Sequence, residues 1–520
     1  MEPATLFVPG EVKGRGLPAK AEADTPAWFR QAPAFFCPAP RTGGSVMLTF
    51  TSGGRYGLPR RLKSFTELPK LLAEARQLGT DVLYLIDWYE GVPGEDADEA
   101  VWNKGDYVPR RDLGGEAALR DGIAAVHAKG GRVLSYLELF VIAKSSTIGK
   151  KKGEDWSLVT KEHREDGLYP NDHKLCPTAP GFDDYMIGMA RKIVGDLGFD
   201  GLHLDSYGYQ RGWKCIAKHG HAKGEASVFD QGAVDLARRV GEAIRAEKAD
   251  AVMMCEGPMV PNMYRHVSAS QDWSVGELLT RWVWDQQGST QVFTAHWSLD
   301  DIHQIIALGH KLSLGGGFWH EAPPSGSPSA WLAKQLPDPT PNKRDRRFRR
   351  FYLEPFMRTI HAWRNAAILA GVPVPSIDRA TPRRWERDEA FDTHEGYAGV
   401  AADLRAAAAT LDPIVSGVQP SAPTAHIKKL CTARAALQPF LEGSTPEVAE
   451  KGDDWLAWRF EGGPRGTVLT MVNVGNEPRS ATVQGSGRFE ELLTGASVEA
   501  RGGRVELQVP PHAVRLFRPA

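Results

Sequence analysis

The feature that most constrains the fold is an alternation of short apolar runs with longer helical patterns, which begins near residue 45. Strands that alternate with helices are typical of a parallel α/β protein. Apolar residues at three- and four-residue intervals predict five helices, over Phe65–Leu78, Glu116–Lys129, Phe182–Leu197, Phe229–Lys248 and Phe351–Leu369. Eight strands are predicted, over Val46–Thr51, Val82–Trp88, Arg132–Leu139, Gly201–Tyr207, Ala251–Glu256, Val267–Asp272, Gln291–Ala295 and Leu312–Phe318. The pattern therefore predicts a (β/α)8 TIM barrel.

The remaining segments predict further parts of the chain. We expect a lead-in segment over residues 1–40, the barrel over 41–372 and a helical connector over 373–450 with a helix near Ala398–Leu411. Short alternating runs separated by glycines then predict a small antiparallel β-sandwich over 451–520. Its expected strands are Trp455–Phe460, Thr467–Val474, Ser480–Gln484, Val505–Val509 and Ala513–Arg518.

Charge and cysteine content limit the functions to consider. Lys and Arg number 63 against 64 Asp and Glu, and this balance gives no electrostatic footprint for nucleic acid or a membrane surface. The five cysteines are widely spaced and include no Cys-x-x-Cys pair, so their spacing indicates neither a zinc site nor a disulfide framework. No metal and no cofactor is expected, and the oligomeric state is left undefined.

The N-terminal residues carry no recognisable export signal. Met1–Lys20 lacks a continuous apolar region, and no run approaches the roughly 18 residues of a membrane span. A cytoplasmic protein is expected from the chain as written. A signal removed beforehand would leave the same sequence, so an extracytoplasmic location stays open.

Two carboxylates stand where predicted strands end. Asp205 closes the run Gly-Phe-Asp-Gly-Leu-His-Leu-Asp, and Glu256 closes the next strand. Barrel active sites lie at the C-terminal ends of the strands, and a pair of carboxyl groups can cleave a glycosidic bond. We assign Asp205 as the nucleophile and Glu256, in an apolar setting that raises its pKa, as the acid/base. The structural alternative is that Asp205 caps a helix or that Glu256 pairs with an arginine.

Other residues near strand ends are candidates for binding a sugar. They comprise acids, aromatic rings and histidines that lie in the last residues of the predicted strands or in the loops after them. Packing or salt bridging is the competing interpretation for each of them, and Tyr207 is considered both for packing and for orienting Asp205. The predicted substrate-binding residues are Asp87, Trp88, Tyr89, Glu138, His173, His203, Tyr207, Asp272, Trp273, His296, Trp319, His320 and Glu321.

The run ending at Asp205, together with Glu256, resembles the retaining α-glycosidase barrels of the α-amylase clan, the dextranases and the endo-α-N-acetylgalactosaminidases. The resemblance implies a nucleophilic Asp after strand four and an acid/base Glu after strand five. Ala-Trp-Phe, Asp-Val-Leu-Tyr-Leu and Gly-Phe-Asp-Gly segments also resemble a bacterial glycosidase-like barrel family without an assigned activity, over residues 27–370. One departure is the His-Asp pair of the α-amylase clan after strand seven, where this chain has His296-Trp297 followed by Asp300 and Asp301.

The expected function is a retaining glycoside hydrolase that acts on α-linked oligosaccharides, polysaccharides or other glycosides. A transglycosylase uses the same covalent intermediate and stays open. A metal-dependent barrel hydrolase would need histidines at strand ends; His219 and His221 have a suitable spacing, but they fall in the loop after strand four. A non-catalytic carbohydrate-binding barrel would leave the two strand-end acids without a role.

Overall fold

The computed structural model describes most of the chain. The described residues are 25–37, 62–86, 88–90, 104–161, 172–208, 212–256, 263–272, 291–295, 297–315, 318–341, 346–374, 391 and 393–520. Among these residues, no helix combines the length and apolar character that crossing a membrane requires.

Eight parallel strands close into a barrel, as the sequence predicts. Strand β1 pairs with both β2 and β10, which closes the sheet in the order β1-β10-β9-β8-β7-β6-β3-β2. The strands are β1 (Ala34–Cys37), β2 (Val82–Leu85), β3 (Arg132–Glu138), β6 (Gly201–Asp205), β7 (Val252–Glu256), β8 (Ala269–Asp272), β9 (Gln291–Ala295) and β10 (Lys311–Gly315). The predicted TIM barrel is therefore confirmed.

The first strand differs from the one that the sequence predicts. Ala34–Cys37, assigned to the lead-in segment, forms β1, and all four of its residues are buried. Four apolar residues buried on both faces show no alternation, so periodicity could not identify them. The predicted strand Val46–Thr51 lies outside the described residues.

The five helices predicted from apolar periodicity are all present. They correspond to α2 (Leu68–Gln77), α4 (Gly115–His127), α6 (Phe182–Arg191), α7 (Ala226–Glu247) and α11 (Arg346–Leu369), while α9 (Leu299–Ala307) was not predicted. In α4, Leu119, Ile123 and Val126 are buried at intervals of four and three residues, so one stripe of the helix faces the barrel. A short hairpin, β4 (Val141–Ala143) and β5 (Asp172–Lys174), and helix α5 (Thr147–Trp156) follow β3.

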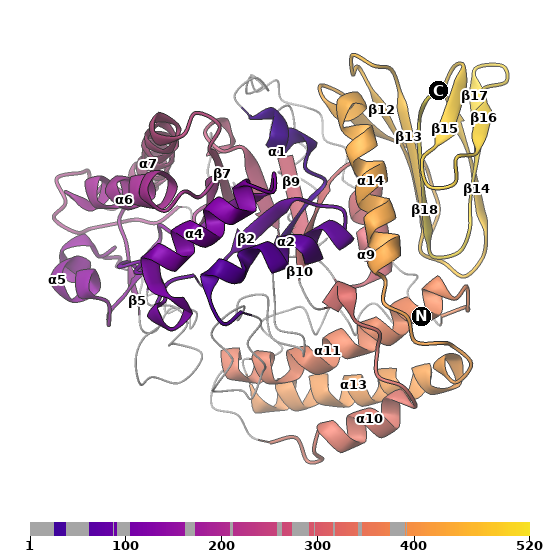
Figure 1. Ribbon diagram of the computed structural model, residues 1–520, viewed down its shortest axis with the longest axis horizontal. Coiled ribbons are helices and arrows are strands. Elements are labelled where there is room, and N and C mark those ends of the chain that lie inside the picture. The colour runs from indigo at the N-terminus through magenta and orange to yellow at the C-terminus, as the bar shows by residue number, and fades with distance from the viewer. Residues whose placement is uncertain are drawn as a thin grey trace.

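Two further helical parts flank the barrel (Figure 1). Helices α10 (Pro328–Gln335), α11 and α13 (His394–Val415) share an apolar core of their own that includes Leu332, Trp363 and Tyr397. The predicted connector helix Ala398–Leu411 lies within α13. Helix α14 (Thr424–Leu441) runs between the barrel and the C-terminal strands and packs against α1 (Ala27–Gln31) and α2.

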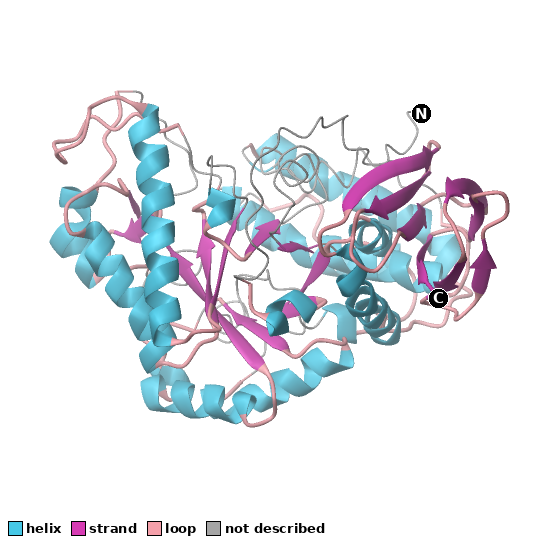
Figure 2. Ribbon diagram, turned by 90° about the horizontal axis from the view of Figure 1, so that it is seen from above, coloured by secondary structure: helices cyan, strands magenta, loops and turns pink. Residues whose placement is uncertain are grey.

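The C-terminal strands form the predicted antiparallel sandwich. A six-stranded sheet has the order β11-β12-β13-β18-β15-β16, and β14 pairs with β17 in a second sheet. Apolar residues such as Leu469, Val483 and Val505 fill the space between the sheets. Figure 2 shows these strands as a group apart from the barrel strands. Their bounds are β11 (Thr445–Lys451), β12 (Trp455–Glu461), β13 (Val468–Asn473), β14 (Arg479–Gln484), β15 (Arg488–Glu491), β16 (Ser497–Glu499), β17 (Arg504–Val509) and β18 (Ala513–Pro519).

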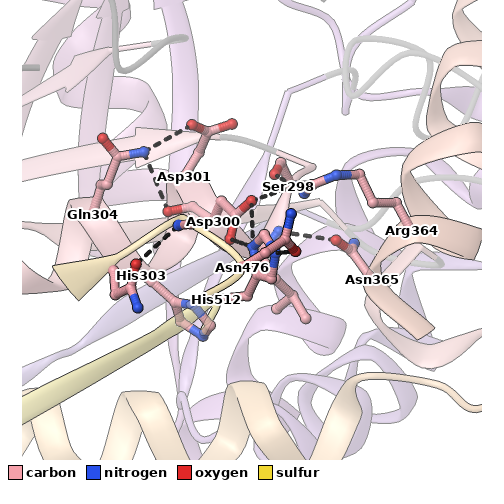
Figure 3. A network of polar contacts seen from close by, with 12 residues as sticks. Ser298, Asp300, Asp301, His303, Gln304, Arg364, Asn365, Asn476 and His512 are labelled. Carbon is pink, nitrogen blue, oxygen red and sulfur yellow. Dashed lines mark hydrogen bonds and ion pairs between the residues drawn. The ribbon is translucent and has the colours of Figure 1, made fainter. Parts of the chain in front are cut away.

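A buried polar network fastens the sandwich to the barrel helices (Figure 3). Asp300, in the first turn of α9, forms an ion pair with Arg364 of α11 at 2.5 Å. On its other side Asp300 lies 3.0 Å from Nδ1 of His512, which precedes β18. Asn476 contacts Nε2 of the same histidine at 2.9 Å, and Thr470 donates a hydrogen bond to the Ala307 carbonyl at 2.7 Å. The sandwich is thus joined to α9 by satisfied polar contacts.

Candidate active site

Three carboxylates occupy one level at the C-terminal ends of adjacent barrel strands. Glu138 of β3 is the register partner of Asp205 of β6, and Leu204 is the partner of Cys255, so Glu256 of β7 follows at the same level. In-register residues of parallel strands point to the same face of a sheet. The three acids therefore share one face.

That face is the interior of the barrel. Tyr84 of β2 has its pKa raised well above the usual value by burial first, and then by the charges of Asp205, Cys37, Glu256 and Glu138. These groups belong to four other strands, and only the inside of a closed barrel brings one ring near all of them. The acids therefore meet above the barrel core at the end where barrel enzymes place their chemistry.

Asp205 is oriented by a tyrosine. The hydroxyl of Tyr136, two residues before Glu138 on β3, donates to Asp205 Oδ2 at 2.8 Å. Asp205 is 9% exposed, and no cationic side chain of the described residues pairs with it. A neutral donor, and not an ion pair with a described residue, therefore holds this carboxyl group in place.

Glu256 lies beside Asp205. Its Oε2 accepts a hydrogen bond from the backbone N–H of Ser206 at 2.9 Å, and Ser206 has a φ of 56°, a left-handed conformation uncommon outside glycine. Burial of the carboxyl group raises the pKa of Glu256 well above its usual value, and the charge of Asp205 and a hydrogen bond to that residue raise it further. Glu256 is thus a carboxyl group suited to keep a proton at neutral pH.

Glu138 is a third, fully buried acid. Its Oε1 accepts the Phe140 N–H at 2.8 Å, and Lys104 Nζ lies 3.7 Å from Oε2. Burial raises the pKa of Glu138 to about 8, Lys104 opposes the shift and Asp205 adds to it. The Tyr136 hydroxyl lies 3.4 Å from Oε2, so this tyrosine bridges Glu138 and Asp205.

Aromatic residues predicted to bind a sugar form part of the wall instead. Trp88 is fully buried against Phe199 at a ring separation of 5.4 Å, and Tyr89 stacks on Tyr136 at 6.1 Å. His203 lies below Asp205, with Nδ1 2.6 Å from the Tyr84 hydroxyl. Burial lowers the pKa of His203 to about 4, so the ring is neutral at physiological pH.

Several other predicted binding residues serve packing. The Tyr207 hydroxyl donates to the Ala233 carbonyl of α7 at 3.0 Å, so it does not orient Asp205. His173, on β5, contacts Ser157 at 3.3 Å and packs on α5. Trp319 is fully buried, and His320 contacts the Glu74 carbonyl at 3.0 Å. Trp319 and His320 belong to a 3-10 turn, Phe318–His320, and Glu321, the next residue, is half-buried.

Four predicted residues are only partly described or not described. Asp87, Trp273 and His296 lie outside the described residues, and Asp272 is described only as the last residue of β8. Asp300 and Asp301, which follow the seventh strand, lie in the first turn of α9. Because Asp300 is held there by Arg364 and His512, it serves the sandwich junction.

Sequence reasoning missed Tyr136, and of a second cluster of polar residues it noted only the spacing of His219 and His221. Tyr136 is a strand-interior tyrosine, and only its inward position two residues before Glu138 could have suggested a role. One ligand-type atom from each of Cys176, Cys215, His219 and His221 lies within 4.8 Å of the other three. The spacing Cys-x3-His-x-His was the available signal, but the fourth member lies in a distant loop.

The fold defines a class by its architecture, a (β/α)8 barrel followed by a C-terminal antiparallel β-domain, and solved structures of α-amylases are similar to it. An α-amylase from Anoxybacillus is 12% identical, with a TM-score of 0.53 over 95% of this chain and 99% of that chain. An α-amylase from Malbranchea cinnamomea is also 12% identical, with a TM-score of 0.54 over 95% and 97%. An α-glucosyl transfer enzyme is 14% identical, with a TM-score of 0.55 over 95% and 99%. These similarities establish the shared fold.

In sequence, residues 18–263 match the family model described as a domain of unknown function, DUF6259. The matched range contains Glu138, Asp205 and Glu256. No curated protein is detectably similar to the chain in sequence.

Proposed function

We propose that this chain is a retaining glycoside hydrolase acting on α-linked sugars, with Asp205 as nucleophile and Glu256 as acid/base. One observation carries the proposal: two side-by-side carboxyl groups at the barrel rim, of which Glu256 has a strongly raised pKa and Asp205 has no cationic partner among the described residues. A glycosidase of this kind needs a protonated acid next to an ionised one.

The first half of the reaction uses both acids. Glu256 transfers its proton to the glycosidic oxygen while an oxygen of Asp205 forms a bond to the anomeric carbon, and the leaving sugar departs. Tyr136 holds Asp205 Oδ2, which leaves Oδ1 as the attacking oxygen. In the second half Glu256, now ionised, takes a proton from water, and the water oxygen replaces Asp205 at the anomeric carbon.

A substrate must separate the two carboxyl groups. They are hydrogen-bonded to each other here, whereas a retaining mechanism uses a separation of about 5–5.5 Å. The sugar would therefore replace the contact between the two acids. Ser206 N–H retains its hold on Glu256 Oε2 at 2.9 Å and gives this movement a fixed pivot.

The proposal is tested by trapping the covalent intermediate. A panel of fluorinated α-glycosyl fluorides should inactivate the protein and add the mass of one sugar to the peptide that contains Asp205. Asp205→Asn should remain unlabelled, and Asp196→Asn, an exposed acid near the start of the same strand, should be labelled like the unmodified protein. Labelling of another residue, or none with any sugar in the panel, would contradict the assignment.

The role of Glu256 is tested by leaving-group dependence. Glu256→Gln should retain substantial activity on aryl α-glycosides with good leaving groups and lose about 10²–10³-fold on poor ones, because only the latter need a proton. The exposed Glu499→Gln serves as the matched control. Equal losses on both kinds of substrate would contradict an acid/base role, and NMR of the first-formed anomer would report retention or inversion.

Transglycosylation is the second candidate function. An α-glucosyl transfer enzyme and a trehalulose synthase share the fold at TM-scores of 0.55 and 0.54. Both reactions pass through the same glycosyl-enzyme, so the acceptor decides the outcome. Adding a sugar acceptor at increasing concentration should yield mainly free sugar from a hydrolase and mainly a new glycoside from a transferase.

A further inference from the structure

Four metal-type ligands converge outside the group of acids. Cys176 lies in the loop between β5 and α6, while Cys215, His219 and His221 lie in the loop between β6 and α7. One ligand-type atom from each lies within 4.8 Å of the other three. Both cysteines are buried and both histidines are half-buried, so the histidines lie on the side of the cluster that is nearer to solvent.

The spacing of these atoms fits a tetrahedral metal. Zinc at about 2.3 Å from sulfur and about 2.0–2.1 Å from nitrogen places two such ligands roughly 3.5 Å apart. Cys176 Sγ and His221 Nε2 are 3.6 Å apart. The His219 and His221 rings lie 5.6 Å apart at 71°, so they approach from different directions, as two corners of a tetrahedron require.

The surroundings prepare the ligand atoms. His221 Nδ1 donates to the Ala222 carbonyl at 2.8 Å, which directs the lone pair of Nε2 toward the sulfurs. Backbone N–H groups of Thr178 and Ala217, each two residues after a cysteine, hydrogen-bond to the sulfurs of Cys176 and Cys215. His219 Nδ1 is buried without a hydrogen-bond partner in the described part of the chain. The contacts made by His221, Thr178 and Ala217 are of the kind that stabilise imidazole and thiolate ligands.

We propose that Cys176, Cys215, His219 and His221 bind one zinc ion in a closed structural site. Two thiolates and two imidazoles form the ligand set that favours zinc, and four protein ligands leave no position for a reacting water. The site is independent of the glycosidase proposal. It also gives the His219-Gly220-His221 spacing a structural role and removes it as support for a metal-dependent hydrolase.

The loop that holds three of the ligands has no regular secondary structure to hold it in place. Residues 212–225 contain no helix or strand, yet they follow the segment that leaves Asp205. Trp213 is buried and packs on Phe140 at 5.9 Å, while Ile216 N–H bonds to the Val159 carbonyl at 2.7 Å. A zinc ion would add a cross-link to the loop of Cys176, which presses against α7 at Gly232. It would therefore fasten the loop after β6 to its neighbour.

Metal content is the first test. Untagged protein, purified without chelator and analysed by mass spectrometry of the elements, should contain about one zinc per chain. Cys215→Ser and His221→Gln should each lower this content at least tenfold. Cys431→Ser, which changes a buried cysteine of α14 outside the cluster, should keep it. Absence of zinc together with failure to take up added zinc would overturn the proposal.

Ligand identity is the second test and does not depend on folding of the variants. X-ray absorption of the unmodified protein should show two sulfur neighbours at about 2.3 Å and two nitrogen neighbours at about 2.0 Å from zinc. A bound water or a ligand set other than two sulfurs and two nitrogens would overturn the closed site. So would a disulfide between Cys176 and Cys215 in protein kept under reducing conditions.

Loop order is the third test. Lys214, Lys218 and Lys223 are exposed trypsin sites between and beside the ligands. Removing zinc with a chelator should speed cleavage at these lysines at least tenfold and lower the Tm by about 5–10 °C, with both effects reversed by added zinc. Unchanged cleavage in zinc-depleted protein would overturn the cross-linking role.

Discussion

Asp200 and Asp205 stand at opposite ends of the same strand segment and have opposite surroundings. Asp200 contacts three basic side chains, His127 at 2.7 Å, Arg132 at 2.9 Å and Lys248 at 2.5 Å. Asp205 has a tyrosine hydroxyl and two neighbouring acids. A carboxylate surrounded by basic side chains stabilises a fold, whereas one placed among other acids costs stability, which is common at functional sites. Asp200 therefore has the surroundings of a supporting residue, and Asp205 has those expected from the proposed function.

The largest effect expected from this comparison is on turnover. Asp205→Asn should lower kcat/KM by at least about 10³-fold, because the covalent step is lost. Its Tm should be unchanged or higher, because an amide costs less to bury than a carboxylate without a cationic partner. Kinetics and thermal unfolding of the same preparation give both values. A folded Asp205→Asn variant that keeps most of its activity would contradict the proposed role of Asp205 as nucleophile.

Asp200→Asn should show the reverse pattern. Removing the partner of His127, Arg132 and Lys248 should cost roughly 3 kcal/mol of unfolding free energy. Activity per folded molecule should remain within about threefold of the original, because Asp200 lies at the far end of the strand. Denaturant unfolding and active-site titration measure the two quantities. A large loss of turnover with unchanged stability would contradict a supporting role.

The pH dependence of stability sharpens the same point. Burial raises the pKa of Asp200, but the hydrogen bond and charge of His127 and the charge of Lys248 outweigh it and lower the value to about 2, against 3.8 for an isolated Asp. The contribution of Asp200 is therefore present above about pH 4 and is lost as the pH falls toward 2. The unfolding free energy of Asp200→Asn should fall less steeply with decreasing pH in this range than that of the unmodified protein. The same pH dependence in both proteins would contradict the lowered pKa of Asp200.

Tyr136→Phe is expected to have an intermediate effect. The substitution removes the donor 2.8 Å from Asp205 Oδ2 and leaves the buried ring in place. We expect kcat to fall about 10–100-fold with little change in KM, because the hydroxyl acts on the nucleophile and not on substrate binding. Tyr207→Phe, whose hydroxyl bonds to α7, is the matched control and should leave kcat within about twofold.

The pH dependence of stability also tests Glu138, whose substitution is not expected to show its effect at a single pH. Its pKa of about 8, against 4.5 for an isolated Glu, means that the folded state holds a proton that the unfolded chain releases. Stability should therefore fall as the pH rises from about 4.5 to about 8 and then level off. Glu138→Gln should remove this slope, so its Tm relative to the unmodified protein should be higher at pH 9 than at pH 5. A constant difference would contradict the shift.

The barrel was predictable from sequence because its helices carry clear apolar stripes and its central strands end in acids. Leu119, Ile123 and Val126 in α4 are one such stripe. The strand Ala34–Cys37 was missed because four buried residues carry no period. Asp205 and Glu256 were predicted from their position at strand ends, whereas the contact of Tyr136 with Asp205 crosses a register that only the closed barrel defines.

The four ligand-type residues illustrate the same limit. Cys215, His219 and His221 are near neighbours in sequence, but Cys176 approaches from another loop, so the set exists only after folding. Trp88 and Tyr89 were predicted to bind a sugar from their place after β2, and the structure buries both. Position along a strand predicts the direction of a side chain, while the depth of the surrounding loops decides whether it reaches solvent.

The contact between Asp300 and His512 bears on how the chain is synthesised. It joins residues separated by 212 positions. Asp300 therefore cannot contact His512 until the sandwich has left the ribosome. Until then the Asp300–Arg364 pair lacks its third member, and the Thr470 contact to the end of α9 is also missing. Contacts between residues so far apart form slowly, and completion of the junction between α9 and the sandwich is thereby coupled to translation of the last strands.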